Sequence, residues 1–114
     1  MSAAAASFEL TAGPFRLAAG ADGRLAAEGP LTFATARQAR QLGLEALAAS
    51  AGQQPLEIDC QGVTAADSAG LAVLLDWLAV AKSSGRSLRY LHLPAGLIAL
   101  GRISEVTELI ERGV

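Results

Sequence analysis

The residues best suited to chemistry lie at 67–71, where the chain reads Asp-Ser-Ala-Gly-Leu and turns directly into an apolar helical run. The first N–H groups of a helix have no acceptor within the helix, so a helix start is a favourable place for an anion. Ser68 supplies a hydroxyl at this point, and we expect it to be exposed. An added phosphate there would be electrostatically favoured and would change a contact surface by close to two negative charges.

A purely structural role for the same residues is the competing interpretation. Asp67 and Ser68 are both favoured N-cap residues, and capping alone would explain either of them. No Glu or Gln stands three residues after Ser68, so a reciprocal capping box does not form. Gly70 allows close backbone approach, but it is also an ordinary loop-to-helix residue. The sequence leaves Ser68 open as either a cap or a modifiable surface residue.

No other residues predict a catalytic, cofactor or metal site. His92 could serve as a general base, but no motif places a serine or cysteine beside it. Cys60, the single cysteine, lacks an adjacent base or cation and is expected to be a buried apolar residue. One cysteine and one histidine supply neither an intramolecular disulfide nor a metal-ligand spacing. We therefore expect a protein that is not an enzyme.

Composition narrows the class of partner. The 114 residues fit one domain, and a 52% hydrophobic content suggests a surface that is covered by something else. A formal net charge of −2 offers no basic field for nucleic acid or anionic lipid. We expect residues 1–12 to form a flexible tail without a secretory signal and residues 13–114 to form the single domain. The apolar run 69–81 is far shorter than the ~20 residues that a membrane-spanning helix needs, so we expect a cytoplasmic protein.

The elements that must position the 67–71 motif can be read from periodicity. Apolar positions recur at helical spacing over 36–47, in a helix that should end near 50–52. A second helix is predicted from Ser68 to Ser84, where Gly85 stops it. The hairpin is expected from strands 15–18 and 24–28 around Asp22-Gly23, closed by Gly29-Pro30, and it is followed by strands over 56–60 and 87–92 and a loop over 61–66. A third helix should carry Pro94 in its first turn, where the missing N–H would be unpaired anyway, and an apolar stripe of Leu97, Leu100 and Ile103. A last strand or helical turn is expected over 106–110.

The second predicted helix carries apolar side chains on two sides. At about 100° per residue, one cluster has the width of a normal core stripe. Val73, Trp77 and Val80 cluster nearly opposite, which predicts a partner surface with Trp77 as its anchor. The alternative is that another helix of the same chain covers this second stripe. The core stripe consists of Leu71, Leu74, Leu75 and Leu78.

Several segments in order resemble the STAS domains, the family named for sulfate transporters and anti-sigma factor antagonists. The resemblance covers roughly Phe15 to Ile110 and is carried by Leu-Glu-Ile-Asp at 56–59, Gly62-Val63 and the 67–71 motif. It implies an α/β fold, a mixed β-sheet with helices packed mainly on one face, that acts through protein contacts. In the antagonist branch the residue matching Ser68 is phosphorylated by a partner kinase.

A narrower resemblance is to the MlaB-type subfamily, the stand-alone STAS subunits of bacterial lipid-asymmetry ABC transporters. It rests on residues 67–78, on Leu-His-Leu-Pro-Ala-Gly-Leu at 91–97 and on Leu-Gly-Arg-Ile at 100–103. It implies a subunit that binds the transporter's cytoplasmic ATPase and, through it, the permease complex. Two positions depart from the pattern: His92 replaces a commoner Asn, and Glu105 stands where Gly is expected.

Two functions follow as hypotheses. The first is an interaction subunit that docks on the ATPase, stays peripheral to the inner membrane through it and supports phospholipid trafficking. The second is an anti-sigma factor antagonist switched by phosphorylation of Ser68, with an anti-sigma factor kinase as its partner. Neither needs a cofactor, a metal or nucleic acid. The predicted partner-binding residues are Asp67, Ser68, Ala69, Gly70, Val73 and Trp77.

Overall fold

A computed structural model describes residues 15–20, 24–49 and 55–114. The predicted tail 1–12, the Asp22-Gly23 turn and the end of the first helix near 50–52 lie outside these residues. Strands and helices alternate after an opening hairpin, as the periodicity predicts. The elements are β1 (Arg16–Ala19), β2 (Leu25–Leu31), α1 (Ala36–Ala49), β3 (Leu56–Ala66), α2 (Ser68–Ser83), β4 (Leu88–Leu91), α3 (Ala95–Ile103) and α4 (Thr107–Arg112).

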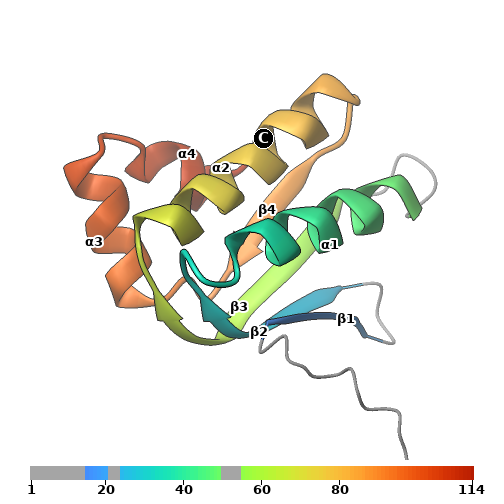
Figure 1. Ribbon diagram of the computed structural model, residues 1–114. Coiled ribbons are helices and arrows are strands. Elements are labelled where there is room, and N and C mark those ends of the chain that lie inside the picture. Colours follow the sequence, from blue (N-terminus) through green and yellow to red (C-terminus); the bar gives the residue numbers. More distant parts are fainter. Residues whose placement is uncertain (1–14, 21–23, 50–54) are drawn as a thin grey trace, which may run out of the picture.

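The four strands form one mixed sheet in the order β1-β2-β3-β4 (Figure 1). β1 and β2 pair antiparallel, whereas β2 with β3 and β3 with β4 pair parallel. Parallel neighbours need a crossover, and α1 and α2 supply the two crossovers on the same side of the sheet. The structure therefore has the expected α/β fold, with a mixed sheet and its helices on one face.

The two central strands are longer than the sequence predicts. β2 runs through Gly29 and Pro30 to Leu31, and β3 continues through the expected loop 61–66. The predicted end of the hairpin at Gly29-Pro30 and the predicted loop over 61–66 were both wrong. β2 and β3 provide backbone partners for each other up to the pairing of Leu31 with Ala66. The register shifts beside Gly29 and Pro30 accommodate residues that local propensity would exclude from a strand. The long β3 carries the chain directly to the start of α2.

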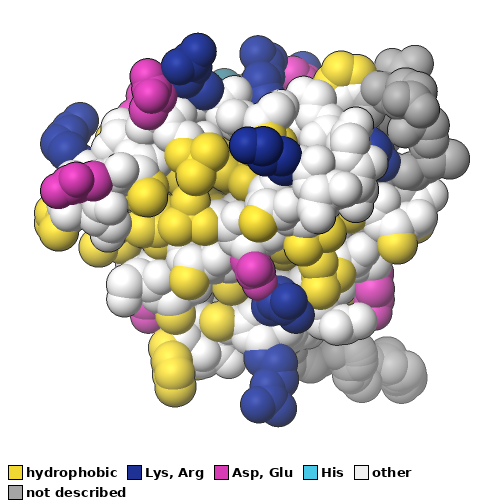
Figure 2. Space-filling view, turned by 90° about the horizontal axis from the view of Figure 1, so that it is seen from above, with side chains coloured by type: hydrophobic (Ala, Val, Ile, Leu, Met, Phe, Trp, Pro, Cys, Tyr) yellow, Lys and Arg dark blue, Asp and Glu magenta, His cyan; other side chains and the backbone are white. Residues whose placement is uncertain are grey.

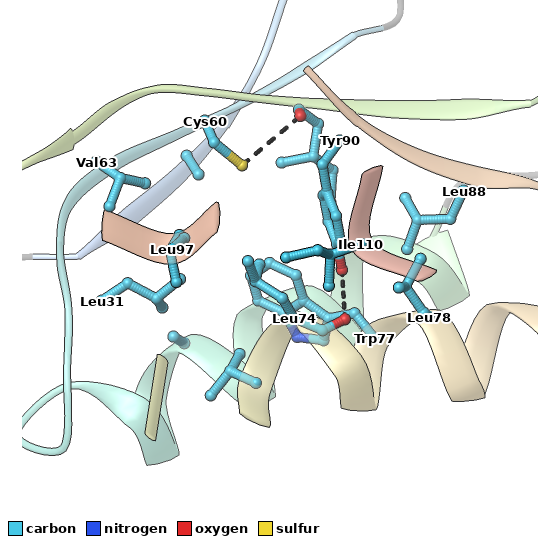
Figure 3. Close-up of a cluster of buried hydrophobic side chains, with 14 of the residues drawn as sticks. Leu31, Cys60, Val63, Leu74, Trp77, Leu78, Leu88, Tyr90, Leu97 and Ile110 are labelled. Atoms are coloured by element: carbon cyan, nitrogen blue, oxygen red, sulfur yellow. Dashed lines mark hydrogen bonds between the residues drawn. The ribbon is translucent and has the colours of Figure 1, made fainter. Parts of the chain in front are cut away.

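The core lies between the sheet and the helices (Figure 3). Tyr90 points from β4 towards α2, and its hydroxyl donates a 2.6 Å hydrogen bond to the Leu74 carbonyl. Trp77 is fully buried, and the Phe15 ring lies 6.3 Å from it, centroid to centroid. Most of the core residues are aliphatic and come from both layers. Fully buried side chains include Leu31, Ile58, Cys60, Leu74, Leu78, Leu88, Leu97 and Ile110.

The C-terminal helices follow the prediction in part. α3 begins directly after Pro94, which is its N-cap residue with an extended backbone rather than a residue of its first turn. Leu97 is buried as predicted, but Ile103 is 80% exposed, so the predicted stripe does not extend to the end of the helix. The expected last strand or helical turn is a helix, α4, which lies against β4. After α4, the Val114 N–H donates a hydrogen bond to the Leu88 carbonyl of β4, which is an edge strand of the sheet.

Candidate functional site

Asp67 is the N-cap of α2. Its backbone is extended, with φ −138° and ψ −170°, and its Oδ1 accepts hydrogen bonds from the N–H groups of Ala69 at 2.9 Å and Gly70 at 3.1 Å. The capping prediction is confirmed for Asp67, and Ser68 becomes the first helical residue rather than the cap. Two donors that the sequence suggested were free are therefore already occupied by a carboxylate.

The second oxygen of Asp67 joins the helix start to a different segment. Oδ2 accepts a hydrogen bond from the Phe33 N–H at 3.0 Å, in the turn between β2 and α1. Several backbone N–H donors hold the pKa of Asp67 below its ordinary value of 3.8, and the Phe33 N–H has the largest effect. One ionised side chain thus fixes the relative position of two loops that are 34 residues apart.

The turn before α1 is held from within by Thr35. This buried hydroxyl donates to the Pro30 carbonyl at 2.9 Å and accepts from the Thr32 N–H at 3.0 Å. Strand alternation would have placed Phe33 on the same face as Leu31, in the core. The chain instead leaves the strand at Leu31, and the Phe33 side chain is 84% exposed. Phe33 is the site residue that sequence reasoning missed, because strand and turn are not distinguished by the local pattern.

A shallow groove of about 510 Å³ runs from Phe33 between α1 and α2. Its walls are mostly small and apolar, and an ion pair between Arg40 and Asp76 joins the two helices across it. Figure 2 views this face from above the helices and shows several patches of hydrophobic side chains, with individual charged side chains between them. Ser68 is exposed beside this groove, at the first position of α2. The lining residues are Phe33, Ala36, Arg37, Arg40, Ala69, Ala72, Val73 and Asp76.

The expected outward stripe of α2 is not outward. Trp77 is 0% exposed and Val73 is 5% exposed, and Val80 is half-buried. α1 packs against this side of α2, so the alternative of coverage within the chain is confirmed and an anchor role for Trp77 is ruled out by its burial. Two further residues of the predicted partner-binding site lie in different environments. Ala69 lines the groove. Gly70 is buried against the Leu31 carbonyl, which leaves no room for a Cβ.

The candidate catalytic residues do not assemble into a reactive centre. His92 Nδ1 lies 3.1 Å from Asp59 Oδ1, and this pair is exposed rather than enclosed in a cleft. The Gln61 N–H, with a smaller effect from His92, lowers the pKa of Asp59. Burial raises the pKa of Cys60 to about 12, so its thiol stays protonated and unreactive. Within the described part of the chain, no three His, Cys, Asp or Glu side chains lie together as a metal site requires.

Charged side chains on β-strands pair with one another. Arg16 of β1 lies 2.6 Å from Glu28 of β2, and Arg89 of β4 lies 2.7 Å from Glu57 of β3. Arg24 also reaches Glu57, at 3.3 Å. The cross-strand ion pairs lower the pKa of Glu57, first through Arg89. The charged side chains of these ion pairs are in contact with solvent, whereas the groove on the helical side of the molecule is mostly apolar.

A family profile described as "Mlab, STAS domain" matches residues 16–111, and the chain belongs to this family of STAS domains. Among solved structures, the chain is similar to the anti-sigma factor antagonist SpoIIAA in its unphosphorylated form, with a TM-score of 0.58 and 14% identity over 78% of this chain and 82% of that one. Comparison with curated proteins gives no match. Across the described residues, no helix is long and apolar enough to cross a bilayer.

Proposed function

We propose that this STAS domain is a non-catalytic interaction subunit that binds the cytoplasmic ATPase of an ABC transporter for phospholipid trafficking. The observation that carries the proposal is the 84% exposure of Phe33 beside the start of α2. An aromatic side chain left in water costs free energy unless a partner covers it, and aromatic residues are frequent anchors of protein interfaces. The contact surface would comprise Phe33, Ser68, Ala69 and the groove wall behind them.

The surface is held in place before any partner arrives. Asp67 and Thr35 both bind the turn that presents Phe33, through the hydrogen bonds at its Phe33 and Thr32 N–H groups. A preorganised anchor loses less conformational freedom on binding, which favours affinity. Asp67 in this proposal positions the anchor, and Ser68 is a contact residue at the rim.

The choice of partner rests on the family. The profile that matches 16–111 carries the MlaB description, and the segments 91–97 and 100–103 resemble the same subfamily. Through the ATPase the domain would associate with the permease complex at the cytoplasmic side of the inner membrane. Its role would be to support assembly and activity of a transporter that maintains outer-membrane lipid asymmetry.

A second candidate function is an anti-sigma factor antagonist regulated by phosphorylation of Ser68. The observation in its favour is that Ser68 is exposed and is not the helix cap, so its hydroxyl is accessible to a kinase. The solved structure of SpoIIAA belongs to a protein named as such an antagonist. Its partner would be an anti-sigma factor kinase.

Co-purification with an alanine variant tests the proposal. The tagged chain should be isolated from its host together with the ATPase, and Ser68 should be unmodified by intact mass. Phe33→Ala should weaken ATPase binding by more than about tenfold and leave the unfolding temperature unchanged. Ile103→Ala is the matched control, because Ile103 is similarly exposed, at 80%, but lies on α3 outside the groove.

Two results would overturn this function. Equal ATPase binding by Phe33→Ala, Ile103→Ala and the unaltered chain would remove the proposed surface. Isolation of a kinase in place of the ATPase, with a phosphate on Ser68, would replace the transporter role with the antagonist role.

A further inference from the structure

We propose that the groove between α1 and α2 selects a partner segment in which a carboxylate stands beside an apolar side chain, and that Arg37 is the residue that recognises the carboxylate. This inference rests on the function proposed above, because it concerns the chemistry of the partner that covers Phe33. It goes further by predicting the sign of the partner's charge and the residue that reads it.

The groove has an apolar floor with room for an inserted side chain. Ala36 of α1 and Ala69 and Ala72 of α2 line it, together with Val73, which is 5% exposed. Ala72 is exposed and Ala69 is half-buried, so the floor is accessible to a partner. Small residues on both walls create the depression, and an aliphatic or aromatic side chain would fill it better than water does.

The charges around the groove are not balanced. Arg40 and Asp76, both lining it, form an ion pair with each other. Arg37 lies one helical turn before Arg40, on the same side of α1, and is exposed. Within the described part of the chain, no carboxylate pairs with Arg37. The groove therefore offers one cation without a counterion, at the end nearest Phe33.

A guanidinium at an apolar rim favours a carboxylate more than it would in open water. Binding of a partner would remove water from Phe33 and the alanine walls, and it would lower the local dielectric around Arg37. Arginine can hold a carboxylate through two parallel hydrogen bonds, which fixes geometry as well as charge. A partner segment with a cation at the same point would be rejected.

A protein segment fits these charges better than an anionic lipid surface. Lipid recognition by electrostatics generally uses a cluster of about 4–8 basic residues. Here Asp76 already neutralises Arg40, so Arg37 acts alone, and the whole chain has a formal net charge of −2. Protein–protein interfaces are instead enriched in aromatic residues and arginine and have a polar rim around the buried core, which fits Arg37 beside Phe33.

Charge reversal at Arg37 tests the inference, with the ATPase proposed above as the probe. Arg37→Glu should weaken ATPase binding by more than about tenfold, and Arg37→Gln by less. Added salt should weaken binding by the unaltered chain more than binding by Arg37→Gln, because the ion pair is absent from the variant. Arg102→Glu is the matched control: it makes the same charge change at an exposed arginine on α3, outside the groove, and should bind normally.

Parallel measurements separate failure of this inference from failure of the proposed function. If Phe33→Ala weakens ATPase binding and Arg37→Glu does not, the charge selection is wrong while the contact surface stands. If neither variant weakens binding, both proposals are overturned. Binding to phosphatidylglycerol-containing vesicles that is lost in Arg37→Glu, with ATPase binding unchanged, would assign the groove to lipid and overturn the inference. Restoration of Arg37→Glu binding by an acid-to-lysine change in the ATPase would support it directly.

Discussion

The indole of Trp77 occupies the space that Gly43 leaves on the neighbouring helix. A Cβ on Gly43 would overlap the indole nitrogen and Cε2, so no other residue fits this position without displacement of the ring. Trp77 Nε1 donates a 3.3 Å hydrogen bond to the Arg40 carbonyl on the same helix as Gly43. The close approach of α1 and α2 follows from this contact, and the groove that starts at Phe33 lies between the same two helices.

Trp77→Ala should therefore reduce stability rather than remove a binding anchor. Truncation of a buried tryptophan typically costs about 3–5 kcal/mol, a large part of the total for a domain of this size. Urea unfolding followed by far-UV circular dichroism measures the loss without relying on tryptophan fluorescence. A variant as stable as the unaltered chain that no longer binds the ATPase would restore the outward-facing interpretation of Trp77.

Asp67→Asn should make the domain less sensitive to acid. The pKa of Asp67 is lowered in the folded chain, first by the Phe33 N–H. The ionised carboxylate therefore stabilises the fold fully at pH values above 3.8, its ordinary pKa, and this contribution is lost as the pH falls through the lowered pKa. Asparagine keeps one oxygen for the cap, but its NH2 group cannot accept from the Phe33 N–H.

Urea midpoints measured from neutral pH to well below 3.8 provide the check for Asp67. Glu57 and Asp59, whose pKa values are also lowered, contribute acid sensitivity to both proteins. The informative quantity is therefore the difference between the two curves, which should shrink as the pH falls below 3.8. A constant difference over the whole range would show that the Asp67 charge does not contribute.

Glu105→Gly should stabilise the domain by about 1 kcal/mol. Glu105 follows the C-cap of α3 with φ 61°, and the next N–H, of Val106, reaches back to the Gly101 carbonyl at 2.8 Å. This is the left-handed position at which helices favour glycine. Glu105→Ala is the control, since alanine has the same left-handed penalty, and thermal unfolding should separate the two variants. Equal melting temperatures would contradict the backbone explanation.

The two departures from the family pattern share a physical basis that only the backbone angles reveal. His92, where the resemblance predicts Asn, has φ 55°, and Glu105, where the resemblance predicts Gly, has φ 61°. Asn and Gly are the residues that adopt the left-handed region most readily. His92 and Glu105 adopt this region at some local cost to stability.

Local features were predictable from the sequence because short-range chemistry determines them. The Asp67 cap, the start of α3 within one residue of Pro94 and the α2 stop near Gly85 each follow from which groups lie within one helical turn. The ordered 56–59, 62–63 and 67–71 segments were sufficient to indicate the family. Partner-binding roles for Ser68 and Ala69 remain predictions.

Tertiary structure decided which apolar side chains meet water. The second stripe of α2 had two interpretations because periodicity identifies an apolar side but not what covers it. Coverage came from α1, whose alanines and Gly43 give a weak hydrophobic signal yet allow Trp77 to pack closely. The exposure of Phe33 could not be predicted from periodicity either. It depends on a turn that is held by Thr35 and by Asp67, which is 34 residues away from Phe33 in the sequence. The 67–71 motif identified the helix start from sequence alone, whereas the contact surface beside it exists only when distant segments are brought together.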